Sequence, residues 1–154
     1  MNILGIVCSP RKRGNTALLV EAVLEGAKSR GAKTKIFYFG SLSINPCQAC
    51  NSCKTEGRCI LEDDMQQIYK AIDEADVLVF GTPIYYDHVS AQAKIFIDRL
   101  YAYSWKGFPK GVKAVIIITY EWRRPDGYNN VLEWIEKRFM NYHKIQTVAK
   151  LKAP

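Results

Sequence analysis

The sequence predicts an α/β fold, a three-layer sandwich in which a five-stranded parallel sheet lies between helices. Two segments, 76–81 and 113–119, are continuous apolar runs, which is typical of strands covered on both faces in a parallel sheet. Between the strand-like runs, apolar residues recur every three to four positions, as they do in amphipathic helices. Strands separated by helices in this way imply right-handed crossovers between parallel neighbours.

The first half of the chain supplies two strands and the helix between them. Residues 2–8 form a short apolar run, and residues 33–39 alternate polar and apolar side chains, as a half-buried or edge strand does. We expect Asn15 or Thr16 to cap the intervening helix, which Gly31 ends. The apolar face of this helix comprises Leu19, Ala22, Val23 and Ala27.

The second half continues the alternation. Asp63 and Gln66 have the spacing of a capping box at the start of a helix whose buried face carries Met65, Ile68, Tyr69 and Ile72. A third helix follows the 76–81 strand, and its apolar face comprises Ala93, Phe96, Ile97 and Leu100. After the 113–119 strand, we expect a fourth helix over 128–142 and a fifth strand over 144–149.

This order of elements fits the flavodoxin-like strand order 2-1-3-4-5. Residues 1–154 are expected to form a single domain of this kind, with the C-terminal helix short or absent because few residues follow the fifth strand. Such a helix would cover one face of the sheet. We therefore expect a second subunit to cover that face, in a homodimer or higher homo-oligomer.

Composition limits the partners. The formal net charge is +7, but the basic residues are scattered and no helix-turn-helix or RNA-binding aromatic motif accompanies them. This favours a solvated surface with a local anion site over a nucleic-acid partner. No apolar run approaches the roughly 20 residues that cross a membrane, and the start lacks a secretory signal. We expect no membrane partner and a cytoplasmic location.

The turn between the first strand and the first helix has the composition of a phosphate site. Backbone N–H groups and the helix dipole favour an anion there, hydroxyl and amide side chains donate hydrogen bonds, and a guanidinium neutralises charge. The candidates are Ser9, Arg11, Gly14, Asn15 and Thr16. The turn matches neither G-x-G-x-x-G nor the Walker P-loop, which disfavours a dinucleotide fold or a nucleoside triphosphatase. An ordinary polar turn is the alternative.

Cys8 ends the first strand, where low-molecular-weight tyrosine phosphatases have their nucleophile. That chemistry needs five residues, then arginine and a hydroxyl, so that the loop wraps the phosphate around the sulfur. Here Arg13 comes one residue early and position 14 is glycine. Cys8 therefore reads as a small buried residue.

Four of the five cysteines lie close together, in a loop spanning 46–60: Cys47, Cys50, Cys53 and Cys59. Two-residue gaps let successive thiolates curl around one centre, and a cubane cluster needs four such ligands. The grouping suits a metal site in a reducing compartment better than a disulfide framework. Zinc and bare or regulatory thiols remain alternatives, although structural zinc sites usually pair two C-x-x-C hairpins across a longer gap.

Three segments together carry a family resemblance. They are Ser9-Pro10-Arg11-x-x-Gly14-Asn15-Thr16, Cys59-Ile60-Leu61-Glu62-Asp63-Asp64-Met65 and Gly81-Thr82-Pro83-Ile84-Tyr85-Tyr86. In this order they resemble the NADPH-dependent FMN reductase superfamily, and most closely its iron-sulfur flavoprotein group. The resemblance implies that the first segment holds the FMN phosphate and that the four cysteines ligate a [4Fe-4S] cluster.

The resemblance also implies which residues contact the flavin ring. It implies that the isoalloxazine packs against Thr82, Pro83, Ile84, Tyr85 and Tyr86. This agrees with the crevice that such a sheet opens between its first and third strands. Two departures stand out: Cys8 replaces a glycine of the family, and Tyr120-Glu121-Trp122 replaces a glycine-rich turn.

Three functions follow as alternatives. The first is an iron-sulfur flavoprotein that couples the cluster to FMN and exchanges electrons with a small carrier such as ferredoxin. The second is an NAD(P)H-dependent FMN or quinone reductase without a cluster, with NAD(P)H as co-substrate. The third is a non-catalytic flavin-binding or zinc-binding module. Hydride transfer at the flavin needs no acid or base, so no catalytic residue is predicted. We expect the cysteine loop at the same edge of the sheet as the flavin, with electron transfer inside the chain or across a dimer.

Overall fold

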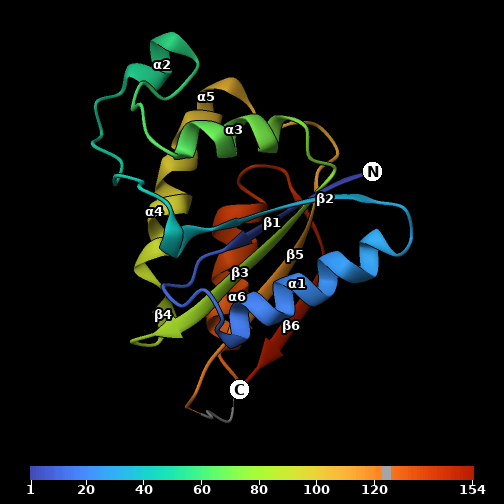
Figure 1. Cartoon of the computed structure of the whole chain (residues 1–154). Helices are drawn as coiled ribbons and strands as arrows, with labels where there is room; N and C mark the ends of the chain where they lie inside the picture. Colours follow the sequence, from blue (N-terminus) through green and yellow to red (C-terminus); the bar gives the residue numbers. More distant parts are fainter. Residues whose placement is uncertain (123–125) are drawn as a thin grey trace.

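The computed structural model describes residues 1–122 and 126–154, and a twisted parallel sheet forms its centre (Figure 1). Five parallel strands lie in the order β2-β1-β3-β5-β6, which confirms the predicted flavodoxin-like order. Their bounds are β1 Asn2–Val7, β2 Lys33–Tyr38, β3 Val77–Tyr85, β5 Lys113–Thr119 and β6 Gln146–Ala153. A sixth strand that the sequence did not predict, β4 (His88–Val89), pairs antiparallel with the end of β3.

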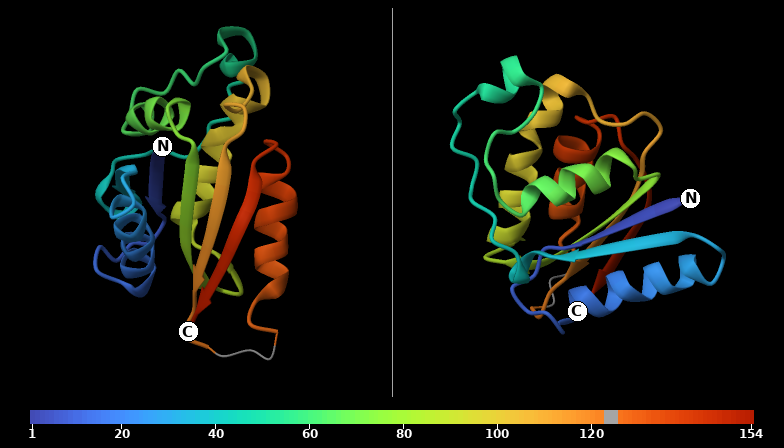
Figure 2. Two further views of the ribbon diagram at one scale, coloured as in Figure 1. Left: turned by 90° about the vertical axis from the view of Figure 1, so that its right-hand side faces the viewer. Right: turned by 45° about the horizontal axis from the view of Figure 1, so that its top comes forward.

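The helices form the two outer layers of the sandwich. The longer helices are α1 Asn15–Lys28, α3 Met65–Asp73, α4 Ala91–Arg99 and α6 Asn129–Trp134. The short elements are η1 Phe39–Ser41, α2 Ser52–Glu56, η2 Leu100–Ala102 and α5 Tyr103–Lys106, with a π-helix, η3, at Ile135–Met140. In the right-hand view of Figure 2, α1 lies below the sheet while α3, α4 and α6 lie above it.

Alternating strand residues divide the core into two clusters. On the α1 side, Val20 and Leu24 pack with strand residues such as Val79 and Ile117. On the other side, the Phe80 ring packs on helix residues, including Phe96 at 5.7 Å between ring centroids. Strand residues point alternately to the two faces of the sheet, and both faces are covered by helices. The side chains on both faces must therefore be apolar, which explains the uninterrupted apolar runs in the sequence.

The last helix and the last strand differ from their predicted forms. The predicted helix over 128–142 begins as α6 and continues as the π-helix η3, in which Asn141 N donates to Glu136 O. The wider turn lets Ile135 and Met140, five residues apart and both fully buried, face the sheet together. The final strand starts two residues later than predicted and runs to Ala153.

The edge strand β6 leaves apolar side chains at the surface. Leu151 pairs with Ile117, whose side chain points toward α1, so Leu151 belongs to the same face. It is 39% exposed, and Val148 is 50% exposed. Within the described residues, no helix follows β6 to cover this face.

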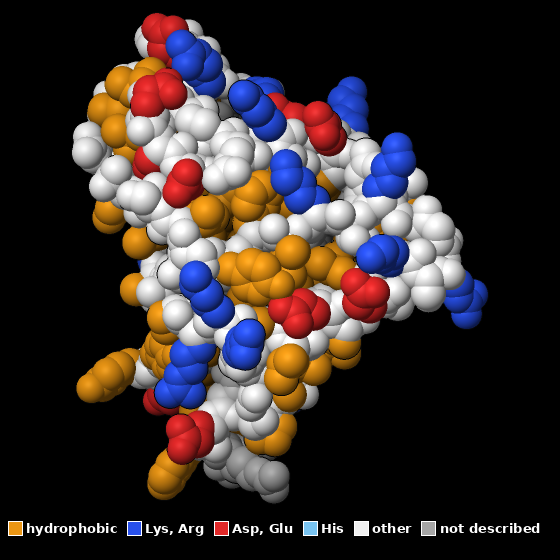
Figure 3. All heavy atoms as spheres, in the orientation of Figure 1, with side chains coloured by type: hydrophobic (Ala, Val, Ile, Leu, Met, Phe, Trp, Pro, Cys, Tyr) orange, Lys and Arg blue, Asp and Glu red, His pale blue; other side chains and the backbone are white. Residues whose placement is uncertain are grey.

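The surface mixes charges of both signs. Figure 3 shows lysine and arginine side chains interspersed with acidic ones over the face in view, and apolar side chains reach the surface between them. None of the helices in the described residues is both long enough and apolar enough to span a bilayer.

Candidate functional site

Three loops meet where β1, β3 and β5 end. Val7 pairs with Gly81, Pro83 pairs with Thr119, and Cys8 N donates to Gly81 O at 2.8 Å. The loop after β1 therefore lies directly beside the last part of β3. This is the switch point at which a sheet of this order binds ligands.

The loop after β1 leads into α1 without a side-chain cap. Gly14 is the N-cap residue, with extended backbone, and no side chain accepts a hydrogen bond from the first turn. The prediction that Asn15 or Thr16 caps the helix is therefore wrong, because α1 already begins at Asn15. The uncapped N–H groups, together with the positive end of the helix dipole, fit an anion such as a phosphate.

The polar side chains of this loop differ in how they are placed. Ser9 is buried, and its Oγ accepts a hydrogen bond from Arg11 N at 3.1 Å, which leaves the hydroxyl hydrogen free to donate. The side chains of Arg11 and Asn15 are exposed. Thr16 is buried, and its Oγ1 lies 2.7 Å from Thr119 Oγ1. Its hydroxyl is therefore engaged within the protein, and its backbone N–H is the group left for an anion.

Cys8 is fully buried at the end of β1. Burial raises the pKa of its thiol well above the usual value. A nucleophilic cysteine needs a lowered pKa, so this environment disfavours the phosphatase-like alternative. The residue behaves as part of the core, as predicted.

β3 extends beyond Gly81 and carries the predicted ring segment. Thr82, Pro83 and Ile84 are buried within the strand, whereas Tyr85 is 41% exposed. Tyr86 stands fully exposed in the two-residue turn to β4, and φ is positive at both turn residues, 48° at Tyr86 and 59° at Asp87. Positive φ at both positions is the geometry of a type I′ hairpin turn. Of the five predicted ring residues, the two tyrosines are those presented to solvent.

A hydrogen-bonded serine joins the two loops, and the sequence analysis missed it. Ser90 Oγ donates to Cys8 O at 2.6 Å, and Ser90 N donates to Thr82 Oγ1 at 3.2 Å. The same hydroxyl caps α4 by accepting from Ala93 N at 3.1 Å. Ser90 precedes a helix in the way that N-cap serines do, which is the only sequence signal that could have singled it out.

The loop after β5 borders the same edge. The rings of Tyr120 and Tyr128 lie 5.0 Å apart, and the Trp122 side chain is 76% exposed. Aromatic side chains thus stand where the resemblance led us to expect a glycine-rich turn.

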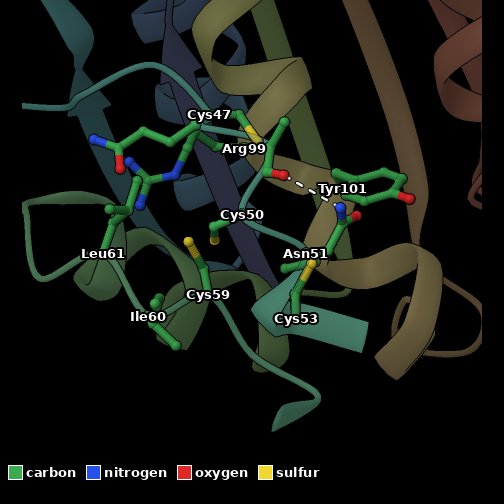
Figure 4. Close-up of a pocket in the computed structure, with 12 residues that line it drawn as sticks. Cys47, Cys50, Asn51, Cys53, Cys59, Ile60, Leu61, Arg99 and Tyr101 are labelled. Carbon is green, nitrogen blue, oxygen red and sulfur yellow. Dashed lines mark hydrogen bonds between the residues drawn. The ribbon is translucent and has the colours of Figure 1, made fainter. Parts of the chain in front are cut away.

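The four cysteines of the 46–60 loop line one pocket, which Arg99, Tyr101 and Ala102 also border (Figure 4). This pocket lies at the C-terminal end of α4, beside α2 and α5, whereas Ser90 and the flavin candidates lie at the N-terminal end of α4 (Figure 1). The expectation that the cysteines share the flavin edge is therefore wrong. Residues 42–51 lead away from the end of β2 and along α4, so the loop reaches the opposite end of that helix.

The cysteine thiols differ in environment. All of them are free, and hydrogen bonds from the side chain and backbone of Ser52 lower the pKa of Cys50. Burial raises the pKa of Cys53, and the charges of the other three cysteines add to the rise. The four sulfurs are thus near enough to influence one another.

The donor set is one that an iron-sulfur cluster can use. Four thiols line one pocket, and a four-iron cluster takes one cysteine thiolate at each of its irons. In the described residues, no three histidine, cysteine or acidic side chains come together closely enough to hold one metal ion.

A family model described as NADPH-dependent FMN reductase matches residues 1–150. The chain belongs to this family. An iron-sulfur flavoprotein of Methanocaldococcus jannaschii is 42% identical over 99 residues, covering 64% of this chain and 51% of the relative. An iron-sulfur flavoprotein of Methanosarcina thermophila is 32% identical over 143 residues, covering 93% of this chain and 74% of the relative.

Among solved structures, the NAD(P)H:quinone oxidoreductase from Methanothermobacter marburgensis superposes with a TM-score of 0.79 at 18% identity. The match covers 99% of this chain and 82% of that structure, and it supports the flavodoxin-like fold of the family. The chain matches only about half the length of some FMN reductase relatives, 51% of the M. jannaschii protein and 54% of an iron-sulfur flavoprotein of Archaeoglobus fulgidus.

Proposed function

We propose that residues 1–154 form one FMN-binding domain of an oxidoreductase, with the flavin at the edge where β1 and β3 end. The observation that carries this proposal is the uncapped start of α1 near Gly81 of β3, together with the exposed tyrosines, Tyr85 and Tyr86, at the end of that strand. Ser9, Arg11, Gly14, Asn15 and the backbone N–H of Thr16 would hold the phosphate. Tyr85 and Tyr86 would contact the ring, while Thr82, Pro83 and Ile84 form the strand that supports them.

FMN would supply hydride or single-electron chemistry, and the protein would supply position and electrostatics. Arg11 offers a positive charge to the phosphate, and the first-turn N–H groups of α1 orient it. Ser90 keeps the phosphate loop and the ring segment in register through Cys8 O and Thr82 Oγ1. NAD(P)H is the proposed co-substrate, in keeping with the family.

We further propose that Cys47, Cys50, Cys53 and Cys59 bind a [4Fe-4S] cluster, as the names of the curated relatives suggest. The shared pocket and the free thiols support it. A cluster held by cysteines of a surface loop suits a reducing compartment, for which we propose the cytoplasm. The second candidate is a cluster-free NAD(P)H-dependent reductase, which the match to the FMN reductase family supports.

The two proposed centres lie at opposite ends of α4. Arg99 is nine positions after Ser90, which corresponds to roughly 14 Å along a helix. Electrons would pass over this length within the chain or to the flavin of another subunit, with a carrier such as ferredoxin as external partner.

We propose that a second copy covers the exposed apolar side chains of β6; a light-scattering mass equal to one chain would oppose this.

The flavin proposal is tested by titrating FMN into the purified protein and into Tyr86→Ala. We expect the wild type to bind and the variant to bind about tenfold more weakly, because an exposed aromatic stacking contact contributes about 1–1.5 kcal/mol. Tyr142→Ala, which also removes an exposed tyrosine, serves as the matched control and should bind normally. A colourless wild type that takes up no FMN would contradict the proposal.

The cluster proposal is tested by iron and sulfide analysis of anaerobically purified protein, with its visible spectrum. We expect about four irons and four sulfides per chain. Bound FMN with no iron would favour the cluster-free reductase, and the rate of NAD(P)H oxidation would then separate that enzyme from a non-catalytic flavin module.

A further inference from the structure

Arg99 is the largest fully buried side chain in the described residues, and it stands at the base of the cysteine loop. Its Nη1 donates to Asn45 O at 2.8 Å and to Asp63 Oδ2 at 2.6 Å, while Nη2 donates to Asp63 Oδ1 at 3.1 Å. Asn45 precedes the 46–60 loop and Asp63 follows it. One guanidinium therefore holds both ends of the loop.

The carboxylate of Asp63 also helps to hold the two ends of the 46–60 loop together. It also accepts hydrogen bonds from Asn45 N and Met65 N, both at 3.0 Å. Burial raises the pKa of Asp63, but the bonds from Arg99, Asn45 and Met65 outweigh that effect and hold the pKa below its usual value. Asp63 is thus a charged partner of Arg99 and also accepts from the first N–H of α3. The predicted capping box does not form, because the Gln66 side chain donates to Cys59 O and Leu61 O instead.

The third nitrogen of the guanidinium group, Nε, is buried and has no hydrogen-bond partner among the described residues. A buried N–H without an acceptor costs about 1–3 kcal/mol, so such groups normally have a partner. Arg99 borders the pocket formed by the four cysteines (Figure 4), and it lies near enough to Cys59 for their charges to interact.

The pocket's chemistry indicates what the missing acceptor is. Thiolate and sulfide sulfurs accept hydrogen bonds, and those bonds tune the reduction potential of a cluster. Asp63 offsets much of the charge of Arg99. We therefore expect the hydrogen bond from Nε–H to change the reduction potential of a bound cluster more than the net charge of the Arg99–Asp63 pair does.

We propose that Arg99 is a positioning residue of the cysteine pocket, which fixes both ends of the 46–60 loop through Nη1 and Nη2 and donates its Nε–H to a sulfur of the bound cluster. This inference rests on the proposed cluster. A hydrogen bond of this kind favours the more negative, reduced state, so it raises the reduction potential.

The direct test uses wild-type protein produced with arginine that carries ¹⁵N in its guanidinium group. Its cluster is then reconstituted anaerobically. Pulsed EPR of the reduced cluster should show a ¹⁵N coupling, which disappears in Arg99→Lys and persists in Arg30→Lys, a matched control on the surface. No coupling in the labelled wild type would overturn the Nε assignment even if every variant failed to fold.

Two further readouts address the loop. In Arg99→Lys we expect about tenfold faster loss of iron to a chelator and a more negative midpoint potential of the cluster. A tenfold effect is typical when a residue that supports metal ligands is replaced. In iron-free protein, hydrogen exchange of 46–60 should be faster in Arg99→Lys than in Arg30→Lys. Equal iron retention, potential and exchange would refute the proposal while leaving the cluster intact. A wild type that binds no iron would instead refute the cluster, and the Nε contact with it.

Discussion

Thr16 Oγ1 lies 2.7 Å from Thr119 Oγ1, and this buried contact joins the first turn of α1 to the end of β5. The two residues are 103 positions apart. The bond fixes the start of α1, and with it the uncapped N–H groups, against the sheet edge where three loops meet. The position of the proposed phosphate site thus depends on a pair of hydroxyls that bond to each other.

We expect Thr119→Val to lower the free energy of unfolding by about 1–3 kcal/mol, because Thr16 is left with a buried hydroxyl and no partner. The double variant Thr16→Val/Thr119→Val should cost less than the sum of the two single changes, since neither hydroxyl then remains. Urea denaturation of all four proteins measures the coupling. Strict additivity would show that the pair contributes nothing.

Gly81 provides the space in which α1 approaches β3. An added Cβ would lie 2.6 Å from Val20 Cγ2 and 3.0 Å from Thr16 Cγ2. We expect Gly81→Ala to destabilise the protein by about 1–3 kcal/mol and to weaken FMN binding, because α1 must shift. Gly26→Ala is the control: no atom lies within 4 Å of its added Cβ, so it should gain about 0.5–1 kcal/mol from helix propensity. Thermal unfolding compares them, and equal melting temperatures would contradict the close approach.

The pair formed by Asp63 and Arg99 should dominate the stability of the cysteine loop. Asp63→Asn leaves a buried guanidinium without a countercharge, and we expect a loss of about 3–5 kcal/mol in the free energy of unfolding. Asp98→Asn breaks the exposed pair with Lys94 and should cost less than about 1 kcal/mol. Similar losses in the two variants, measured in guanidinium chloride, would mean that burial of the pair is unimportant.

His143 should make stability depend on pH. It contacts the rings of Phe108, Phe139 and Tyr142, and burial lowers its pKa from 6.5 to about 4. The unfolded chain takes up this proton near pH 6.5, whereas the folded chain does so only near pH 4, so stability falls as the pH drops through this window. Allowing for partial exposure, we expect His143 to account for a loss of about 1–2 kcal/mol.

The measurement is urea denaturation at a series of pH values between those two pKa values. The wild type should lose more stability toward the acid end than His143→Gln, which carries no titrating ring. Parallel pH profiles for the two proteins would show that His143 does not titrate differently on folding. Above the unfolded pKa, His143 should contribute no pH dependence.

Hydrophobic periodicity is a local property, and it sufficed for the alternation of strands and the main helices. The 76–81 and 113–119 runs indicated strands buried on both faces, and their alternation with helices was compatible with the five-strand order that the structure shows. Helix ends were less accurate. Gly14, with no side chain to donate or accept, is the N-cap residue of α1, so the predicted caps at Asn15 and Thr16 failed.

The sequence by itself indicated the sheet and grouped four cysteines in one loop, because these follow from spacing along the chain, and it was compatible with the strand order that the structure shows. The tertiary structure alone decided that the cysteines lie at the far end of α4 from the proposed flavin edge, and that Arg99 is buried beneath them. An arginine in the last turn of a helix ordinarily faces solvent, and here its bonds to Asp63, 36 positions away, and to Asn45 O, 54 positions away, offset the cost of burial. Ser90 and Cys8, 82 positions apart, likewise meet only once β1 and β3 are paired. Contacts of this range arise from packing of the whole sheet, and no local pattern encodes them.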